Sequence, residues 1–97
     1  MSRLASTYHK QAKLDTAQQL QEQVLIQRKK MLGEHHPDTL TSMSNLAHTY
    51  HRQGKLDAAQ HLHEQALIQC KEVLGKHHPD TLESMSNLAH TYEAQGK

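Results

Sequence analysis

The chain repeats itself with a period of 42 residues, and this feature constrains its fold more than any other. When residues 1–55 are aligned with residues 43–97, 40 of the 55 pairs are identical. No residues are left over between the copies, so a single repeat array is predicted over residues 1–97 rather than two linked domains. The array divides into a partial first repeat, a complete second repeat and the first helix of a third: 1–33, 34–75 and 76–97.

Each period contains two segments whose apolar residues recur at spacings of three and four, the pattern of one helix face. In the first segment these residues are Leu40, Met43, Leu46, Ala47 and Tyr50. Strand-like alternation is not sustained anywhere in the sequence. The chain is therefore predicted to be all-α, with five helices over Ser2–Gln11, Leu14–Leu32, Pro37–Gln53, Leu56–Leu74 and Pro79–Gln95.

Glycine and proline mark the expected ends of these helices. Gly54 stands between the two helices of a repeat, where a left-handed glycine commonly ends a helix. Ala12 takes its place in the first copy, and the turn expected there would need no positive φ. Gly33 ends the second helix of the first repeat, and Pro37 with Asp38 begins the next helix, because proline suits the first helical position and a carboxylate suits the first turn.

The loop between repeats reads LGEHHPDTL at Leu32–Leu40 and LGKHHPDTL at Leu74–Leu82. Its paired histidines suggest a metal site at first sight. Adjacent histidines on an extended segment diverge, however, and no third ligand lies nearby in the sequence. The loop is therefore interpreted as a connection that ends one helix and begins the next, and no metal and no cofactor are expected.

Composition excludes several classes of partner. The net charge is +1 and the pI about 8.0, which leaves no electrostatic footprint for nucleic acid. No apolar run is long enough to span a membrane, and the first residues lack the apolar core of a secretory signal. The single cysteine, Cys70, favours a reducing, cytoplasmic setting. Because Arg28 occupies the same place one repeat earlier, Cys70 is expected to be partly exposed.

The repeat resembles the tetratricopeptide repeat, a helix–turn–helix unit, at its signature positions: Leu46, Ala47, Tyr50, Gly54, Leu56, Ala59, Ala66 and Leu67. Its longer period, with HPDT between units, is similar to the kinesin-light-chain subtype. The sequence departs from the usual pattern in the middle of the second helix, where Gln21 or His63 replaces an aromatic residue. The resemblance implies a right-handed superhelical solenoid that acts as a protein–protein interaction scaffold and binds an extended peptide on the concave face of its first helices.

Small polar residues gather on the first-helix face opposite the apolar one. Ser, Thr, Asn and His are poor helix formers, so a face that was only solvated would favour Glu, Lys and Gln. Two explanations stay open: close packing of neighbouring first helices, or amide and imidazole groups that bind a peptide backbone. The candidate peptide-binding residues are Arg3, Lys10, Thr41, Ser44, Asn45, His48, Arg52, Ser86, Asn87 and His90.

The ten histidines carry weaker signals. His48 and His51 are three residues apart, which permits only a weak two-ligand surface site, so pH-dependent surface charge is the favoured role. His61 and His63 are expected on different helix faces. No nucleophile–base pair, phosphate loop or paired carboxylates occur, and the chain is not expected to be an enzyme.

The last helix carries an apolar face with no following helix in the sequence to cover it: Leu82, Met85, Leu88, Ala89 and Tyr92. The first helix is nearly the same element in sequence, which favours exchange between molecules. A homo-oligomer formed through the terminal helices is therefore expected. The alternative to peptide binding is an architectural or self-assembling role with no peptide ligand.

Overall fold

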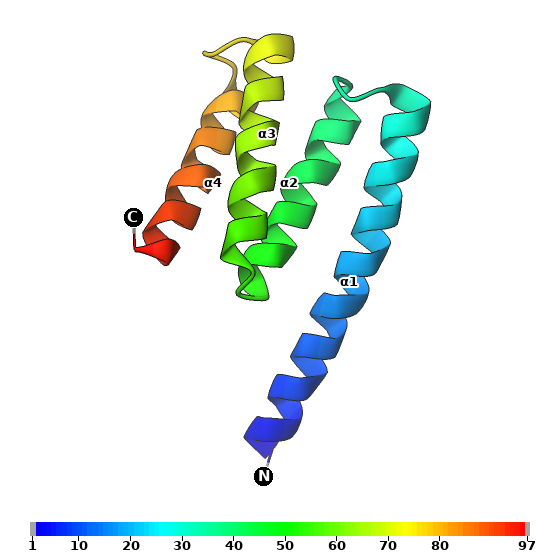
Figure 1. Cartoon of the computed structure of the whole chain (residues 1–97), viewed down its shortest axis with the longest axis vertical. Coiled ribbons are helices and arrows are strands. Elements are labelled where there is room, and N and C mark those ends of the chain that lie inside the picture. The colour runs from blue at the N-terminus through cyan, green and yellow to red at the C-terminus, as the bar shows by residue number, and fades with distance from the viewer. Residues whose placement is uncertain (1, 97) are drawn as a thin grey trace.

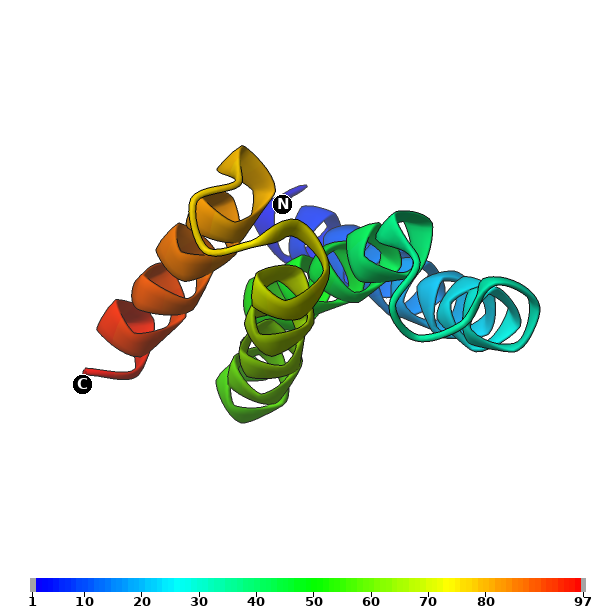
Figure 2. The same cartoon turned by 90° about the horizontal axis from the view of Figure 1, so that it is seen from above.

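The computed structural model describes residues 2–96, with side chains from residue 10 onward. Four α-helices and no strand occur over this range. They are α1 (Ser2–Leu32), α2 (Pro37–Arg52), α3 (Leu56–Leu74) and α4 (Pro79–Gln95). Successive helices lie side by side and alternate in direction (Figure 1). Seen from above, α2 and α4 lie toward one side and α3 toward the other (Figure 2).

The prediction of five helices is wrong, because residues 2–32 form one continuous helix instead of two. In the second repeat, Gly54 reverses the chain with a φ of +83°. Its equivalent is Ala12, and an L-residue with a Cβ adopts the left-handed conformation only at a cost of about 1–2 kcal/mol. The helix therefore continues through Ala12, and the N-terminal part of α1 extends beyond the other helices (Figure 1).

The turn at Gly54 satisfies the carbonyl groups that end α2. The Gly54 amide donates to the His51 carbonyl at 3.0 Å, and the Lys55 amide donates to the Tyr50 carbonyl at 2.8 Å. This pair of hydrogen bonds is the Schellman motif, which needs a residue with positive φ at the glycine position. The two copies are nearly identical in sequence here, but the copy with Gly54 forms a helical hairpin and the copy with Ala12 forms one long helix.

The loop between repeats follows the predicted order of helix end, short loop and helix start. α1 ends at Leu32 and α2 begins at Pro37. The second histidine of the pair has a role that the sequence did not predict: the Asp38 amide donates to Nδ1 of His36 at 3.1 Å, so this imidazole caps α2. The next repeat does the same with His78 and Asp80, also at 3.1 Å.

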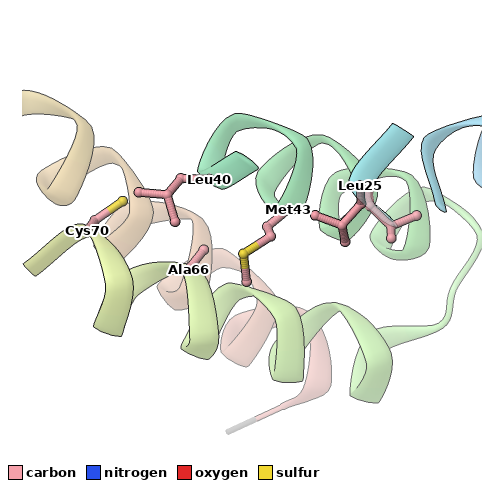
Figure 3. Close-up of a cluster of buried hydrophobic side chains, with 6 residues drawn as sticks. Leu25, Leu40, Met43, Ala66 and Cys70 are labelled. Atoms are coloured by element: carbon pink, nitrogen blue, oxygen red, sulfur yellow. The ribbon is translucent and has the colours of Figure 1, made fainter. Parts of the chain in front are cut away.

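The core lies between α1, α2 and α3 and contains Leu25, Leu40, Met43, Leu46, Ala66 and Cys70. Leu40, Met43 and four others of this small cluster interleave across the helices (Figure 3). Because few side chains are large, buried threonines also fill the interior, and Thr39 and Thr81 are fully enclosed. Each donates its hydroxyl to the carbonyl of the loop glycine before it, Gly33 or Gly75, at 2.8 Å.

Cys70 is buried, with 4 % of its surface exposed, which corrects the expectation of partial exposure. Its Sγ lies 3.6 Å from the Ser84 hydroxyl. Arg28, its equivalent, donates from Nη1 to the Ser42 hydroxyl at 2.8 Å and to the Asp38 carbonyl at 2.9 Å. The long Arg28 side chain reaches solvent past Ser42, whereas the short Cys70 thiol stops at the equivalent serine, Ser84. The two residues therefore occupy equivalent positions but differ in burial.

Candidate functional site

A groove of about 170 Å³ lies between α2 and α4, with the C-terminal part of α3 at its base. Cys70 and Leu74 come from α3. The groove brings together four predicted binding residues, Thr41, Ser44, Asn45 and Asn87, and adds Pro37, Leu40, Asp80, Glu83 and Ser84. We call this surface the α2–α4 groove. Its charged lining residues are both acidic.

The two asparagines are the groove residues best suited to bind a ligand. Neither the Asn45 nor the Asn87 side chain hydrogen-bonds to any residue that the structure describes, whereas the Thr41 hydroxyl already donates to the Pro37 carbonyl at 3.1 Å. Each amide offers two donors and an acceptor, which matches the needs of an extended peptide backbone. The small neighbours Ser44 and Thr41 leave these amides accessible.

A second pocket, of about 250 Å³, lies farther along the same two helices. It is lined by His48 and His51 from α2, His63 from α3, and Asn87 and His90 from α4. We call it the histidine pocket. Asn87 lines both this pocket and the α2–α4 groove, so the two form one continuous surface. Sequence reasoning identified three of these residues and missed His51 and His63 as members of the site.

His63 is the unusual member of the histidine pocket. Only 4 % of its surface is exposed, and its Nδ1 has no hydrogen-bond partner among the described residues. Burial, together with the nearby His51 and His48, lowers the pKa of His63 from 6.5 to about 4. The signal in the sequence was the departure from the repeat pattern: the equivalent residue is Gln21, whose Oε1 accepts a hydrogen bond from Thr49 at 2.6 Å.

The threonine that corresponds to Thr49 has a different partner across the helices, although the hydroxyl of each threonine also lies within hydrogen-bond distance of the carbonyl four residues before it, 3.2 Å from Asn45 for Thr49. The Thr91 hydroxyl donates to the Asn87 carbonyl at 3.1 Å and lies 3.5 Å from Nδ1 of His51. It therefore does not pair with His63 as Thr49 pairs with Gln21. The substitution of histidine for glutamine leaves a polar ring atom without a partner, among the described residues, at the wall of the pocket.

The other predicted peptide-binding residues line neither pocket. Arg52 and Ser86 are exposed on α2 and α4. Lys10 is exposed on α1, and the Arg3 side chain lies outside the described residues. Nε2 of Gln53, just after α2, donates to Asp15 at 2.8 Å, so the part of α1 that carries Lys10 continues past this end of α2. Residues 2–11 therefore do not form the separate first helix that was expected to carry Lys10 beside α2.

The predicted self-association residues differ in exposure. Leu82 and Met85 are 50 % and 46 % exposed, whereas the equivalent Leu40 and Met43 are each 4 % exposed. Ala89 is also exposed, and Leu88 and Tyr92 are half-buried. The Tyr92 hydroxyl donates to Glu64 at 2.9 Å, and this hydrogen bond, with burial and the carboxylate charge, raises the pKa of Tyr92.

A family model described as tetratricopeptide repeat matches residues 1–67 and 44–97, which together cover the whole chain. The chain belongs to the tetratricopeptide repeat family. The solved structures similar to this tetratricopeptide repeat protein include one from Podosopora anserina, described as putative kinesin light chain nearly identical TPR-like repeats, and a point variant of the same protein. Each is 34 % identical with a TM-score of 0.82 over 96 % of this chain.

These comparisons support a tetratricopeptide repeat protein of the kinesin-light-chain type. The chain spans 44 % of the length of the solved chains that it matches. No curated protein sequence matches it. Repeats of this family generally mediate protein–protein interaction through surfaces formed by stacked helices.

The described residues hold neither a membrane span nor a metal cluster. None of the described helices combines the length and the apolar character needed to cross a bilayer. Among the described side chains, no three His, Cys, Asp or Glu residues are grouped as a metal site would require. The histidine pocket therefore offers hydrogen-bond donors and acceptors in a shared space rather than a ready coordination sphere.

Proposed function

We propose that this tetratricopeptide repeat protein is a cytoplasmic interaction scaffold that binds an extended segment of a protein partner along α2 and α4. The observation that carries the proposal is the α2–α4 groove, where the amides of Asn45 and Asn87 are without partners among the described residues. An extended peptide exposes a backbone donor and acceptor at each residue, and side-chain amides can pair with both. The carboxylates of Asp80 and Glu83 favour a ligand with neutral or basic side chains in the groove.

Selection from a peptide library, followed by fluorescence anisotropy of the selected peptides, tests this proposal. The double variant Asn45→Ala/Asn87→Ala should weaken binding by about five- to 150-fold, since each lost hydrogen bond contributes about 0.5–1.5 kcal/mol. The matched control is Gln23→Ala/Gln65→Ala, which removes two exposed amides from α1 and α3. Equal affinity of both double variants would show that the groove is not the binding surface.

A second candidate function, self-assembly through the terminal helices, is supported by the exposure of matching apolar faces. In the second repeat, Met43 of α2 and Ala66 of α3 belong to one buried cluster. Their equivalents are Met85 of α4, 46 % exposed, and Val24 of α1, 44 % exposed. The α4 helix of one copy can therefore pack on α1 of a second copy as α2 packs on α3 within one molecule.

Sedimentation velocity between 1 and 100 µM distinguishes self-assembly from a monomeric scaffold. We expect the mass of the unmodified protein to rise with concentration, and Met85→Glu to hold it at the monomer. Ile68→Glu is the control, because Ile68 is 55 % exposed on α3 but belongs to neither proposed contact face. A monomer mass at every concentration would exclude self-assembly and leave the peptide proposal untouched.

A further inference from the structure

The order of the four described helices allows copies of the chain to join end to end. α1 and α3 carry the second helix of a repeat, whereas α2 and α4 are first helices, so the two kinds alternate. α1 and α4 lie at opposite edges of the row of helices (Figure 1). When α1 of one copy is placed beside α4 of another, the alternation continues, and the two helices together form a complete repeat.

Both edge helices expose apolar residues whose equivalents are covered inside the molecule, where α2 packs on α3. Ala89 of α4 is exposed, whereas the equivalent Ala47 is fully buried. Leu20 of α1 is 58 % exposed, whereas the equivalent Leu62 is half-buried. We call the two surfaces the α4 face (Leu82, Met85 and Ala89) and the α1 face (Leu20 and Val24).

Residues 2–11 would cover the α1 face if the chain turned at Ala12. Eight of the residues at positions 1–11 are identical to those at 43–53, which include the C-terminal part of α2 that precedes the turn into α3. Because α1 is one continuous helix, residues 2–11 extend past the end of α2 and leave the α1 face open (Figure 1). The helix of another copy that is equivalent to residues 2–11 and exposes its own apolar face is α4.

Two differences between the copies place opposite charges across such a contact. Thr41 and Cys70 line the α2–α4 groove together, and neither is charged. Their equivalents across the contact between copies are Glu83 of α4 and Arg28 of the next copy. Both described hydrogen bonds of Arg28 come from Nη1, so the other guanidinium N–H groups can donate to the Glu83 carboxylate. The charges therefore favour the same pairing of helices as the apolar faces.

We propose that copies of the protein join head to tail in an open array, in which α4 of one copy occupies the place on α1 of the next that residues 2–11 would otherwise cover. This inference rests on the proposed self-assembly and adds its direction, its register and its intramolecular competitor. The contact joins two different faces, so each added copy presents a new face for growth. Val24 is larger than the equivalent Ala66, and the contact can accommodate it because no turn ties α4 to α1 as Gly54 ties α2 to α3.

Two variants that each block one face test the direction of the contact. Met85→Glu places a charge on the α4 face, and Val24→Glu places one on the α1 face. In sedimentation velocity we expect each variant alone to be a monomer and an equimolar mixture to contain a dimer, because the mixture keeps one intact face of each kind. Ile26→Glu is the control and should assemble like the unmodified protein, since the equivalent Ile68 is 55 % exposed even between two neighbouring helices.

Ala12→Gly tests the intramolecular competitor. Glycine makes a turn available, so residues 2–11 can fold back and cover the α1 face, and the variant alone should be a monomer. We expect it to dimerise with Met85→Glu, to which it offers an intact α4 face. It should not dimerise with Val24→Glu, because neither protein then offers an open α1 face. Ala12→Ser keeps a Cβ and should assemble like the unmodified protein.

Glu83→Thr tests the charge pair by restoring the residue that the preceding repeat carries as Thr41. We expect the association constant to fall by about 1.5- to fivefold at low salt, and its decrease with added sodium chloride to become smaller. The control is Glu72→Thr, because Glu72 is exposed on α3 one turn after Ile68 and lies on the same outer face. An equal effect of both substitutions would exclude the pairing of Glu83 with Arg28.

Several results would overturn the head-to-tail array. Dimerisation of Met85→Glu alone would mean a symmetric contact between α1 helices, and dimerisation of Val24→Glu alone would mean one between α4 helices. A mixture of these variants that stays monomeric would show that the two faces do not pair. If Ala12→Gly assembled like the unmodified protein, residues 2–11 would not be a competitor. A monomer mass for the unmodified protein at every concentration would instead exclude self-assembly itself, and peptide binding through Asn45 and Asn87 would stand.

Discussion

The contact between α1 and α2 and the contact between α3 and α4 are two versions of one design. In both, a tyrosine hydroxyl donates to a glutamate of the preceding helix: Tyr50 to Glu22 at 2.8 Å, and Tyr92 to Glu64 at 2.9 Å. A glutamine amide also donates to an aspartate in both, at 2.8 and 2.9 Å, through the pairs Gln53–Asp15 and Gln95–Asp57. These repeated hydrogen bonds set the same register between helices in both places.

The two contacts differ where the copies differ in sequence. Gln21 and Thr49 are joined by a hydrogen bond. The equivalent of Gln21, His63, has no partner for Nδ1 among the described residues and lines a pocket. The repeated Tyr–Glu and Gln–Asp hydrogen bonds thus hold the helices in the same register while residues between them differ from copy to copy. A substitution at one of these intervening positions can give one copy a binding property that the other lacks.

The largest expected effect comes from His63. Because the folded state lowers its pKa from 6.5 to about 4, the unfolded state binds the proton more readily. This histidine therefore contributes full stability above pH 6.5 and loses it as the pH falls from 6.5 to 4. At about 1.4 kcal/mol per pKa unit, we expect a loss of about 2–3 kcal/mol between pH 7 and 4.

Urea unfolding of the wild-type protein and His63→Gln at several pH values measures this loss. The variant should lack that part of the pH dependence, and the difference between the two proteins removes the contribution of the other titrating groups. Parallel curves for the two proteins across this range would contradict the assignment.

Gly54→Ala should destabilise the turn between α2 and α3, because it places at this turn the residue that the first copy carries as Ala12. A Cβ at Gly54 would meet no atom within 4 Å, so the cost comes from its φ of +83° alone. We expect the free energy of unfolding to fall by about 1–2 kcal/mol, measured by urea denaturation. Gly96, whose φ is +81°, also has no atom near its Cβ position and provides the control near the chain end. If Gly54→Ala and Gly96→Ala lowered the free energy of unfolding equally, the turn between α2 and α3 would have no special dependence on glycine.

Thr49→Val and Thr91→Val should lower the free energy of unfolding by different amounts, because Thr49 is hydrogen-bonded to Gln21 whereas Thr91 is not hydrogen-bonded to the equivalent His63. Thr49→Val leaves Gln21 Oε1 without its donor and should cost about 1 kcal/mol. Thr91→Val loses only the bond to the Asn87 carbonyl, whose equivalent Thr49 makes to Asn45 in addition to its bond with Gln21, and should cost about half as much. In the His63→Gln background a new glutamine–threonine pair can form, so the cost of Thr91→Val, again measured by urea denaturation, should rise to match that of Thr49→Val. An unchanged cost there would argue against equivalent geometry.

Ala12→Gly tests the turn in the opposite direction. A glycine in the middle of α1 lowers the helix propensity by about 1 kcal/mol and makes positive φ available, as at Gly54. We expect residues 2–11 to fold back beside residues 14–32. Small-angle scattering should then give a longest dimension shorter than the 50 Å extent of the molecule with its straight α1. Ala12→Ser, which keeps a Cβ, should leave the dimension unchanged.

The smallest effect concerns the histidine caps, which are the same in both copies. Asparagine is a stronger N-cap than most residues, so His36→Asn and His78→Asn should each raise the free energy of unfolding by a few tenths of a kcal/mol to about 0.5 kcal/mol. Thermal unfolding measures both changes, and His35→Asn is the control because His35 is exposed and does not cap α2. A gain at one site without the other would show that the two loops are not equivalent.

Much of the fold could be predicted because it depends on local chemistry. The start of α2 follows from Pro37 and Asp38, and the buried face of this helix follows from the spacing of Leu40, Met43 and Leu46. The candidate site was predicted in part: Asn45 and Asn87 do line a groove between first helices. Lys10 does not, because its position depended on a turn at Ala12 that the chain does not make.

The sequence by itself determined the repeat, the helix type and the ends of the later helices, since periodicity, proline and glycine act within a few residues of one another. The tertiary structure decided which equivalent positions became different. Ala12 could be identified as a departure from Gly54, but its effect is a competition between a turn and a continuing helix. His63 could be identified as a departure from Gln21, but its burial and its place beside His51 and His90 depend on α2 and α4 packing against α3. Contacts between residues far apart in the sequence carry no local pattern, so only the packed helices assemble the histidine pocket.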